Sequence, residues 1–281
     1  MTAGVRASTT PAASATALGE IAQAFVGARL AARALPAFPG VMPATLAQAY
    51  AIQDAGLALF PDQVVGWKVG RVPPELQARL GDERVAGPTF QGSLRTPAAG
   101  ETVVLGAIAG GFAAVEAEFV YRLAADAPAD KTDWTAREAL ALVAGLHVGV
   151  EFAGSPLKTI NDLGSTAVAS DFGNNAALVV GSEIPGWRAR ADESLTAETF
   201  IDGVRVGSGT AASVPGGPAL ALAFLLGHCA GRGLPLKAGM YVTTGAATGI
   251  HEISVGQSAR VSFGEFGEIL CFAEMARPAA R

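Results

Sequence analysis

The feature that most constrains the fold is a change of sequence pattern at Pro61. Before it, apolar residues recur at helical spacing over Leu18–Leu35, and Thr45 is a suitable N-cap for a second helix that continues to Phe60. After it, short runs rich in β-branched and aromatic residues are separated by glycine and proline, which predicts β-strands. We expect these strands at 64–70, 102–106, 116–123, 147–152 and 177–181.

A few helices interrupt the strand-rich part. Thr135–Glu138 has the spacing of a capping box and predicts a helix that ends at Gly145. Pro218 lies near the start of another helix, which ends around Gly231–Gly233. Asp202–Gly203 predicts a tight hairpin. Because the strands are clustered rather than alternating strictly with helices, the sequence predicts an α+β protein with a rolled or sandwiched sheet.

Composition argues against several classes of function. Half of the 281 residues are apolar, which is enough to form a large core. The net charge of −5 and the lack of a basic block argue against nucleic-acid binding, and no apolar run approaches the roughly 20 residues of a membrane-spanning helix. Cys229 and Cys271 are expected to be buried free thiols of a cytoplasmic protein. The initial MTAGVRASTTPAASATA has no apolar signal segment and resembles a disordered lead.

Two acidic residues in the segment VEAEF are candidates for chemistry. Because side chains alternate along a strand, Glu116 and Glu118 lie on the same face, about 7 Å apart. Their neighbours are apolar, so two acids there would repel each other unless a positive charge lies between them, and Mg²⁺ or Mn²⁺ binds carboxylate oxygens. The alternative is a strand face exposed to water.

A third acid, Glu151, ends another apolar strand about 35 residues later. A carboxylate in that position is costly unless it is paired. Three acids on two apolar strands are consistent with a metal site that leaves positions open for water and a chelating substrate.

The order of several segments resembles one known family. The segments are GWKVG (66–70), GPTFQGSL (87–94), VEAEF (115–119), GVEF (149–152), DFGNNAALVVG (171–181) and LPLKAGMYVTTG (234–245). Over about 60–278 they resemble the 2-keto-4-pentenoate hydratase branch of the fumarylacetoacetate hydrolase superfamily. The resemblance implies a rolled or sandwiched mixed β-sheet of that family's type. We expect a disordered lead and N-terminal helices over 1–60, and a β-rich metal-binding catalytic domain over 61–278.

The resemblance also implies which residues form the site. The family binds Mg²⁺ or Mn²⁺ through an E-x-E pair and a later acid, which here are Glu116, Glu118 and Glu151. Lys68 matches a family lysine, and a buried ammonium in this apolar run would bind a substrate carboxylate or enolate, unless it extends to solvent.

Further residues match the substrate pocket. Thr244 and Gly245 match a turn that lines the family's pocket, where a hydroxyl and backbone N–H groups suit carboxylate binding; the alternative is an ordinary strand-ending turn. Asn174 or Asn175 would position a water molecule. No residue of the sequence is identified as the general base that activates that water.

By resemblance, the activity expected is a metal-dependent lyase reaction. The enzyme would add water to a 2-hydroxy-2,4-dienoate of the 2-keto-4-pentenoate type and give a 4-hydroxy-2-oxo acid, as in aromatic catabolism. It would act as a cytoplasmic homo-oligomer on a small 2-oxo acid, without nucleic-acid or membrane partners. The alternatives are a 2-oxo-enedioate decarboxylase, an acylpyruvate C–C hydrolase, or a non-catalytic protein that binds dicarboxylates or metal ions.

Three departures from the hydratase pattern keep these alternatives open. Gly154–Pro156 stands where the hydratases usually have Asp-Ser-Arg, so their arginine is missing. Asp171–Asn175 retains the aspartate of Asp-Asn-Ala-Ser-Ser but replaces the serine pair with asparagines. The acid that usually precedes the glycine at Ala86–Gly87 is also absent. The metal ligands therefore match the family better than the residues that select the substrate.

Overall fold

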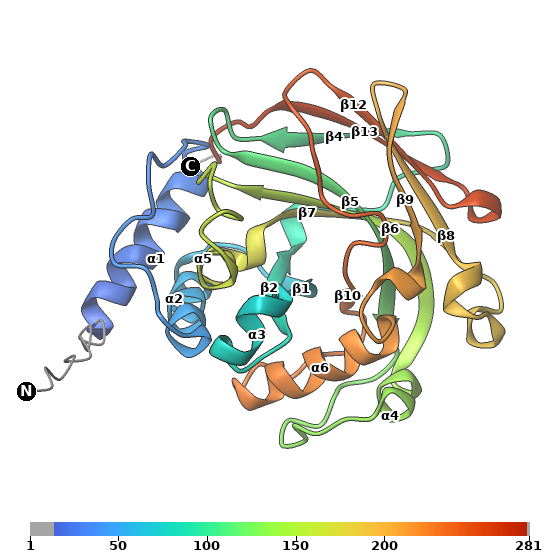
Figure 1. Cartoon of the computed structure of the whole chain (residues 1–281), viewed down its shortest axis with the longest axis horizontal. Coiled ribbons are helices and arrows are strands. Elements are labelled where there is room, and N and C mark those ends of the chain that lie inside the picture. The colour runs from blue at the N-terminus through green and yellow to red at the C-terminus, as the bar shows by residue number, and fades with distance from the viewer. Residues whose placement is uncertain (1–13, 280–281) are drawn as a thin grey trace, which may run out of the picture.

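The computed structural model describes residues 14–279, which form two β-sheets with helices packed around them (Figure 1). The larger sheet has the strand order β2-β1-β10-β5-β6-β7-β3, with β11 also paired to β5. Its strands are β1 (Val64–Arg71), β2 (Arg84–Phe90), β3 (Leu94–Arg95), β5 (Phe112–Leu123), β6 (Val143–Ser155), β7 (Asn175–Glu183), β10 (Tyr241–Thr243) and β11 (His251–Glu252). The smaller sheet has the order β4-β13-β12-β8-β9. Its strands are β4 (Thr102–Ala107), β8 (Thr196–Ile201), β9 (Val204–Thr210), β12 (Ser258–Ser262) and β13 (Glu268–Met275).

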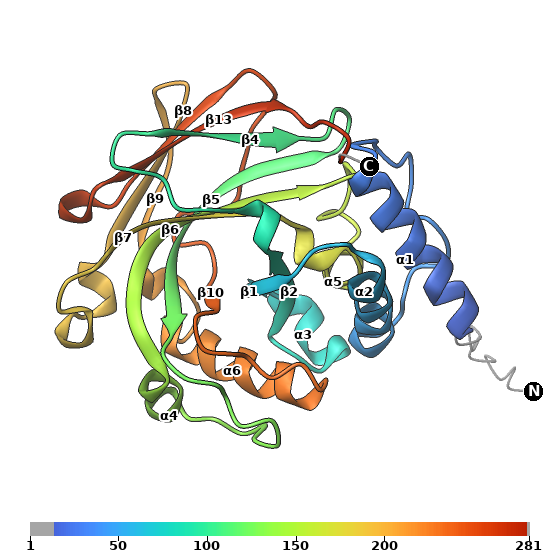
Figure 2. The same ribbon diagram turned by 180° about the vertical axis from the view of Figure 1, so that it is seen from behind.

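The helices lie mainly on the concave side of the larger sheet. They are α1 (Ala15–Leu30), α2 (Leu46–Leu59), α3 (Pro74–Leu80), α4 (Ala136–Ala141), α5 (Ser165–Ser170) and α6 (Pro218–Gly231). Figures 1 and 2 show the long strands β5, β6 and β7 curving around β1 and β2, with the smaller sheet on the outer side. The mixed, curled sheets confirm the expected α+β fold.

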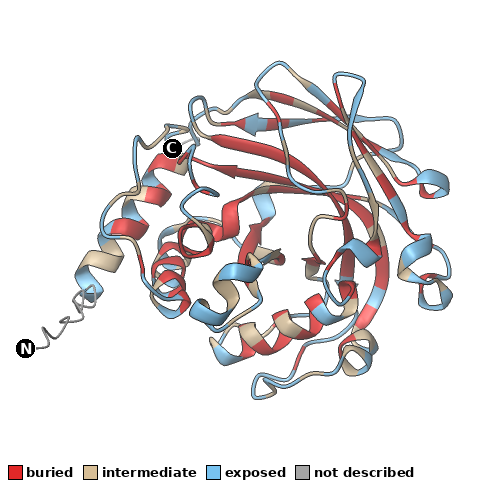
Figure 3. Cartoon of the chain, viewed as in Figure 1, coloured by how far each residue is buried: buried red, intermediate tan, exposed pale blue. Residues whose placement is uncertain are grey.

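The two faces of β5 have different surroundings, and this difference positions the site. Its odd-numbered residues, such as Val115, Ala117 and Phe119, join the main hydrophobic core together with residues of the smaller sheet. Because strand side chains alternate, its even-numbered residues point to the concave side. Figure 3 shows that β5 and β6 are buried over most of their length. Acidic residues on the concave face are therefore shielded from water.

Two of the expected helices end earlier than their patterns indicate. The first ends at Leu30, because Ala32 adopts φ +48° and Leu35 instead donates its N–H to the Pro156 carbonyl at 2.8 Å. The second, α4, has the expected capping box at Thr135, but it ends at Ala141 because β6 begins two residues later. In both places a long-range strand contact outweighs local helix propensity.

Other sequence-based expectations agree with the structure. Thr45 caps α2, and Asp202–Gly203 connects the hairpin β8–β9. Cys229 and Cys271 are both free and buried. None of the helices within residues 14–279 combines the length and the apolar character needed to cross a membrane. The expected disordered lead falls largely on residues 1–13, outside the described part of the chain.

Candidate active site

The three predicted acids meet on the concave face of the larger sheet. Glu116 and Glu118 come from β5, and Glu151 lies directly opposite Glu116 in the antiparallel register of β6. Each offers a carboxylate oxygen, and these oxygens lie within 4.8 Å of one another. Glu118 and Glu151 are fully buried, and Glu116 is 5% exposed. The geometry therefore brings together the two strands that sequence spacing alone could not connect.

The carboxylates have fewer partners than their burial requires. Glu118 accepts a hydrogen bond from the Gly245 N–H at 2.7 Å. Glu151 accepts one from Asn175 Nδ2 at 3.3 Å and lies 3.2 Å from Lys68 Nζ. Glu118 Oε1 and Glu151 Oε2 are buried and have no hydrogen-bond partner among the described residues. Because buried polar atoms are normally paired, these two oxygens fit the donor set of a hard divalent cation.

The electrostatics of the cluster are strongly perturbed. Burial, reinforced by the charge of Glu151, raises the pKa of Glu116 to about 8. Burial and the charges of Glu151 and Glu116 raise the pKa of Glu118 well above its usual value. Burial alone would lower the pKa of Lys68, but the surrounding carboxylates, Glu151 foremost, outweigh it and raise that pKa. Without a metal ion, the cluster therefore retains protons that a cation would displace.

A loop completes one wall of the site. Strand β5 pairs with β10 through 120–122 and with β11 through 114–115, so its middle segment faces the loop that connects those two strands. In this loop, Ala247 N–H donates to the Ala117 carbonyl at 2.8 Å, and the Thr244 hydroxyl donates to the Phe119 carbonyl at 2.8 Å. These bonds hold Gly245 where its N–H reaches Glu118. The hydroxyl of Thr244 is thus used to position the turn.

A strained turn forms the opposite wall. Phe172, Gly173 and Asn174 have φ values of +53°, +66° and +62°, a left-handed run that is costly for residues with a Cβ. The turn packs so tightly against Gly87 that a Cβ at Gly87 would lie 2.1 Å from the Phe172 carbonyl oxygen. Asn174 lines the cavity, and its side-chain oxygen has no hydrogen-bond partner among residues 14–279.

Arg29, on α1, holds this turn in place and was missed by sequence reasoning. Its Nε donates to Asp171 Oδ1 at 2.6 Å, and its Nη atoms donate to the carbonyls of Asn175 and Gly154, each at 2.9 Å. Ser155 donates to the other oxygen of Asp171 at 2.5 Å. No local signal marks Arg29, because its partners lie more than 120 residues away.

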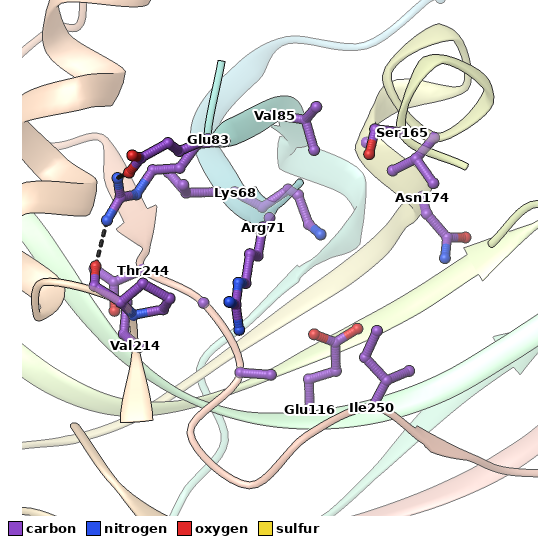
Figure 4. Close-up of a pocket in the computed structure, with 18 of the residues that line it drawn as sticks. Lys68, Arg71, Glu83, Val85, Glu116, Ser165, Asn174, Val214, Thr244 and Ile250 are labelled. Atoms are coloured by element: carbon purple, nitrogen blue, oxygen red, sulfur yellow. Dashed lines mark hydrogen bonds and ion pairs between the residues drawn. The ribbon is translucent and has the colours of Figure 1, made fainter. Parts of the chain in front are cut away.

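A cavity of about 420 Å³ opens beside Glu116, one of the three acids (Figure 4). Five of the predicted site residues line it: Lys68, Glu116, Asn174, Thr244 and Gly245. Glu118, Glu151 and Asn175 are buried behind its wall. The cavity also contains polar residues that sequence reasoning did not select: Arg71, Glu83, Arg84, Asn161 and Ser165. The volume suits a small organic acid.

Comparison with known proteins identifies the fold. No protein-family model matches the chain, and no curated protein matches its sequence. Among solved structures, 4-oxalocrotonate decarboxylase from Pseudomonas putida G7, complexed with calcium and acetate, has a TM-score of 0.75 at 19% identity, covering 93% of this chain and 98% of that one. Fumarylpyruvate hydrolase from Pseudomonas aeruginosa, in complex with Mn²⁺ and pyruvate, has a TM-score of 0.56 at 16% identity, covering 77% and 91%. A yeast fumarylacetoacetate hydrolase family protein has a TM-score of 0.50 at 12% identity, covering 76% and 94%. The chain therefore has the fumarylacetoacetate hydrolase-like fold.

Proposed function

We propose that this protein is a Mg²⁺- or Mn²⁺-dependent enzyme that acts on a small 2-oxo acid. The observation that carries the proposal is the cluster of Glu116, Glu118 and Glu151, which lies at the wall of a cavity and leaves two buried oxygens without partners in the described chain. Structures of the same fold contain calcium, magnesium or Mn²⁺, together with acetate, adipate or pyruvate. When bound, the metal ion would act as a Lewis acid that stabilises negative charge on the C2 oxygen of the substrate.

The surrounding residues have distinct proposed roles. Lys68, which lines the cavity, binds the substrate carboxylate or balances the enolate charge. Gly245 and Asn175 hold Glu118 and Glu151 in position through their hydrogen bonds. Asn174 lines the cavity, and its side-chain oxygen is buried without a hydrogen-bond partner among the described residues, so it can accept a hydrogen bond from a reacting water and orient it. Thr244 shapes the turn that carries Gly245.

We propose hydration as the reaction. The dienol of a 2-hydroxy-2,4-dienoate first takes up a proton at C5 and loses the proton of its C2 hydroxyl, which gives an α,β-unsaturated ketone with the double bond between C3 and C4. Water then adds at C4, conjugate to the C2 carbonyl, and a proton at C3 completes the 4-hydroxy-2-oxo acid. Lys68 favours the intermediate in which the C2 oxygen carries negative charge, because it is a buried cation held in a fixed position, and such a cation stabilises charge strongly.

Decarboxylation of a 2-oxo-enedioate is the second candidate, with C–C hydrolysis of an acylpyruvate as a further option. The structure with a TM-score of 0.75 is a decarboxylase, and the one with 0.56 is a hydrolase of fumarylpyruvate. All three reactions place negative charge on the same C2 oxygen. A protein that only binds dicarboxylates would need the same three acids and Lys68, but it would not convert the bound acid.

The homo-oligomeric state stays a prediction, which sedimentation of the purified protein tests.

The test is a turnover assay with Mg²⁺ or Mn²⁺ present. Loss of the ultraviolet absorbance of 2-hydroxypenta-2,4-dienoate, without release of CO₂, supports hydration. Release of CO₂ from 2-oxohex-3-enedioate supports decarboxylation instead. Glu118→Gln is expected to abolish turnover, whereas Glu20→Gln, an exposed change on α1, is a matched control that retains it. Binding of these acids without any turnover would leave the binder as the better account.

A further inference from the structure

Gln53 is a fully buried polar residue of α2 that the proposed mechanism does not use. Its side chain is inaccessible to solvent, and it is not among the residues that line the cavity. Burial of an amide is costly unless its polar atoms are hydrogen-bonded. Both the nitrogen and the oxygen of this amide are paired, and their partners belong to three different elements of the fold.

The nitrogen of this amide connects β2 with α5. Gln53 Nε2 donates to the Ala86 carbonyl on β2 at 2.9 Å and to the Ala169 carbonyl at the end of α5 at 2.8 Å. β2 is an edge strand and Ala169 lies in the last turn of a helix, and backbone groups in both kinds of position lack a regular partner. Figures 1 and 2 show α2 beside α5, with β2 close by. One side chain therefore sets the separation of these two elements.

Two further side chains make this connection rigid. Arg232, the C-cap residue of α6, donates from Nη2 to Gln53 Oε1 at 2.9 Å, which fixes the orientation of the amide. Arg232 is paired with Asp54, and its guanidinium carbon lies 4.4 Å from the centroid of the Tyr50 ring. The Tyr50 hydroxyl accepts the Ala86 N–H at 2.9 Å. Both backbone groups of Ala86 are therefore held by side chains of α2.

The elements that Gln53 connects enclose the turn at 172–174. Gly87 lies so close to this turn that a Cβ added to it would be 2.7 Å from the Cα of Gly173. A Cβ added to Gly173 would lie 3.0 Å from the Cδ of Lys68, so the turn also packs against the stem of that lysine. A left-handed backbone of this kind persists only where the surrounding structure holds it. A change in the separation of β2 and α5 would therefore displace the turn.

We propose that Gln53 is a positioning residue for the site. Its amide holds β2 and α5 at the separation at which the turn at 172–174 contacts Lys68 and places Asn174 at the wall of the cavity. Gln53 acts through these two residues and does not touch the substrate. The inference rests on the proposed function, in which Lys68 binds the substrate and Asn174 orients water.

The metal ligands are held independently of Gln53. Glu116 and Glu151 are fixed by the register of β5 and β6, and Glu118 is supported by the Gly245 N–H on the other wall of the site. A change at Gln53 should therefore weaken substrate binding while metal binding is retained. A purely structural role would lower stability without separating these two affinities.

The test variant is Gln53→Glu. It keeps the shape of the side chain and an oxygen for Arg232, but it replaces the donor nitrogen with an oxygen that repels the two backbone carbonyls. Val261→Ala is the matched control, because it removes buried methyl groups from β12 of the smaller sheet and lowers stability outside the cavity.

Calorimetry with the full chain measures the affinity for Mg²⁺, and then the affinity of the Mg²⁺-loaded protein for oxalate. Gln53→Glu is expected to weaken oxalate binding about tenfold, the loss of a charge-assisted hydrogen bond from Lys68, and to change the Mg²⁺ affinity by less than about threefold. Hydrogen exchange over 165–175 is expected to become faster in this variant. The control is expected to match the wild type in both affinities and in this exchange.

The outcomes separate this inference from the proposed function. If folded Gln53→Glu binds oxalate as the wild type does, or if Val261→Ala weakens oxalate equally, the positioning role is wrong and the proposed function stands. If the wild type binds oxalate equally with and without Mg²⁺, or not at all, the proposed function is wrong. Hydrogen exchange over 165–175 then decides alone: faster exchange in Gln53→Glu supports its hold on the turn, and unchanged exchange overturns it.

Circular dichroism shows whether each variant is folded. If Gln53→Glu does not fold, Tyr50→Phe takes its place, because it removes the other hydrogen bond from α2 to Ala86. A weaker oxalate affinity in Tyr50→Phe, with the Mg²⁺ affinity retained, supports the inference, and an unchanged oxalate affinity overturns it.

Discussion

Replacing Glu118 with glutamine should stabilise the metal-free protein and weaken the stabilisation that a metal ion provides. Glu118 is fully buried, and burial with the charges of Glu151 and Glu116 raises its pKa well above the usual 4.5. The folded metal-free protein therefore holds a proton that the unfolded chain releases above pH 4.5. Such a group contributes stability that is present below the unfolded pKa and is lost as pH rises, at about 1.4 kcal/mol per pH unit.

Glutamine does not titrate, so the Glu118→Gln variant does not lose this stability as pH rises. It also retains an oxygen that can accept the Gly245 N–H. Between pH 5.5 and 7.5, the variant should therefore gain up to about 3 kcal/mol over the wild type in EDTA, or several degrees in Tm at about 2 to 4 °C per kcal/mol. In Mg²⁺ most of this advantage should disappear, because the wild type gains about 2.7 kcal/mol at a metal concentration of 100 Kd and the variant, which lacks a ligand, gains less.

The assay is thermal and urea unfolding at pH 5.5, 6.5 and 7.5, in EDTA and in Mg²⁺. Glu20→Gln, an exposed change on α1, is the control and should follow the wild type under every condition. The reasoning is refuted if Glu118→Gln destabilises the metal-free protein at pH 7.5. It is refuted equally if the variant gains as much stability from Mg²⁺ as the wild type does.

Three further predictions concern the walls of the site and its protons. Arg29→Met leaves the buried carboxylate of Asp171 without its ion pair, so the free energy of unfolding should fall by about 3 to 5 kcal/mol. An unchanged midpoint of urea unfolding would contradict this role of Arg29. Gly87→Ala places a Cβ 2.1 Å from the Phe172 carbonyl, so it should disrupt the turn and reduce turnover, whereas full activity would show that the turn shifts freely. Since the pKa of Glu116 is about 8 and that of Glu118 is also raised, Mg²⁺ must displace protons when it binds. The Mg²⁺ affinity measured by calorimetry should therefore increase about tenfold per pH unit between pH 6 and 8 for each proton released. An affinity that does not change with pH would contradict this.

The sequence predicted those parts of the fold and site that depend on local patterns. Alternation along β5 placed Glu116 and Glu118 on one face, and the structure has them there. The hairpin at Asp202–Gly203 and the cap at Thr45 also follow from local chemistry. The direct pairing of Glu116 with Glu151 could not be predicted, because register between strands depends on the whole sheet.

Contacts over long distances in the chain account for what the sequence did not predict. Arg29 contacts Asp171 across 142 positions, and nothing in its helix distinguishes it from a surface arginine. Arg71 follows the recognised GWKVG run directly, yet only the fold shows that it enters the cavity and lies opposite Arg84. The helix expected to continue to Leu35 ends early, because Leu35 forms a bridge with Leu157.

The most direct test of the account is a crystal structure of the protein soaked with Mn²⁺ and oxalate, with anomalous diffraction used to locate the metal. The account predicts one anomalous peak among the carboxylates of Glu116, Glu118 and Glu151, with oxalate on the side of the ion that faces the cavity and Lys68. No peak at this cluster under saturating Mn²⁺, or carboxylates that point away from a common centre, would contradict it.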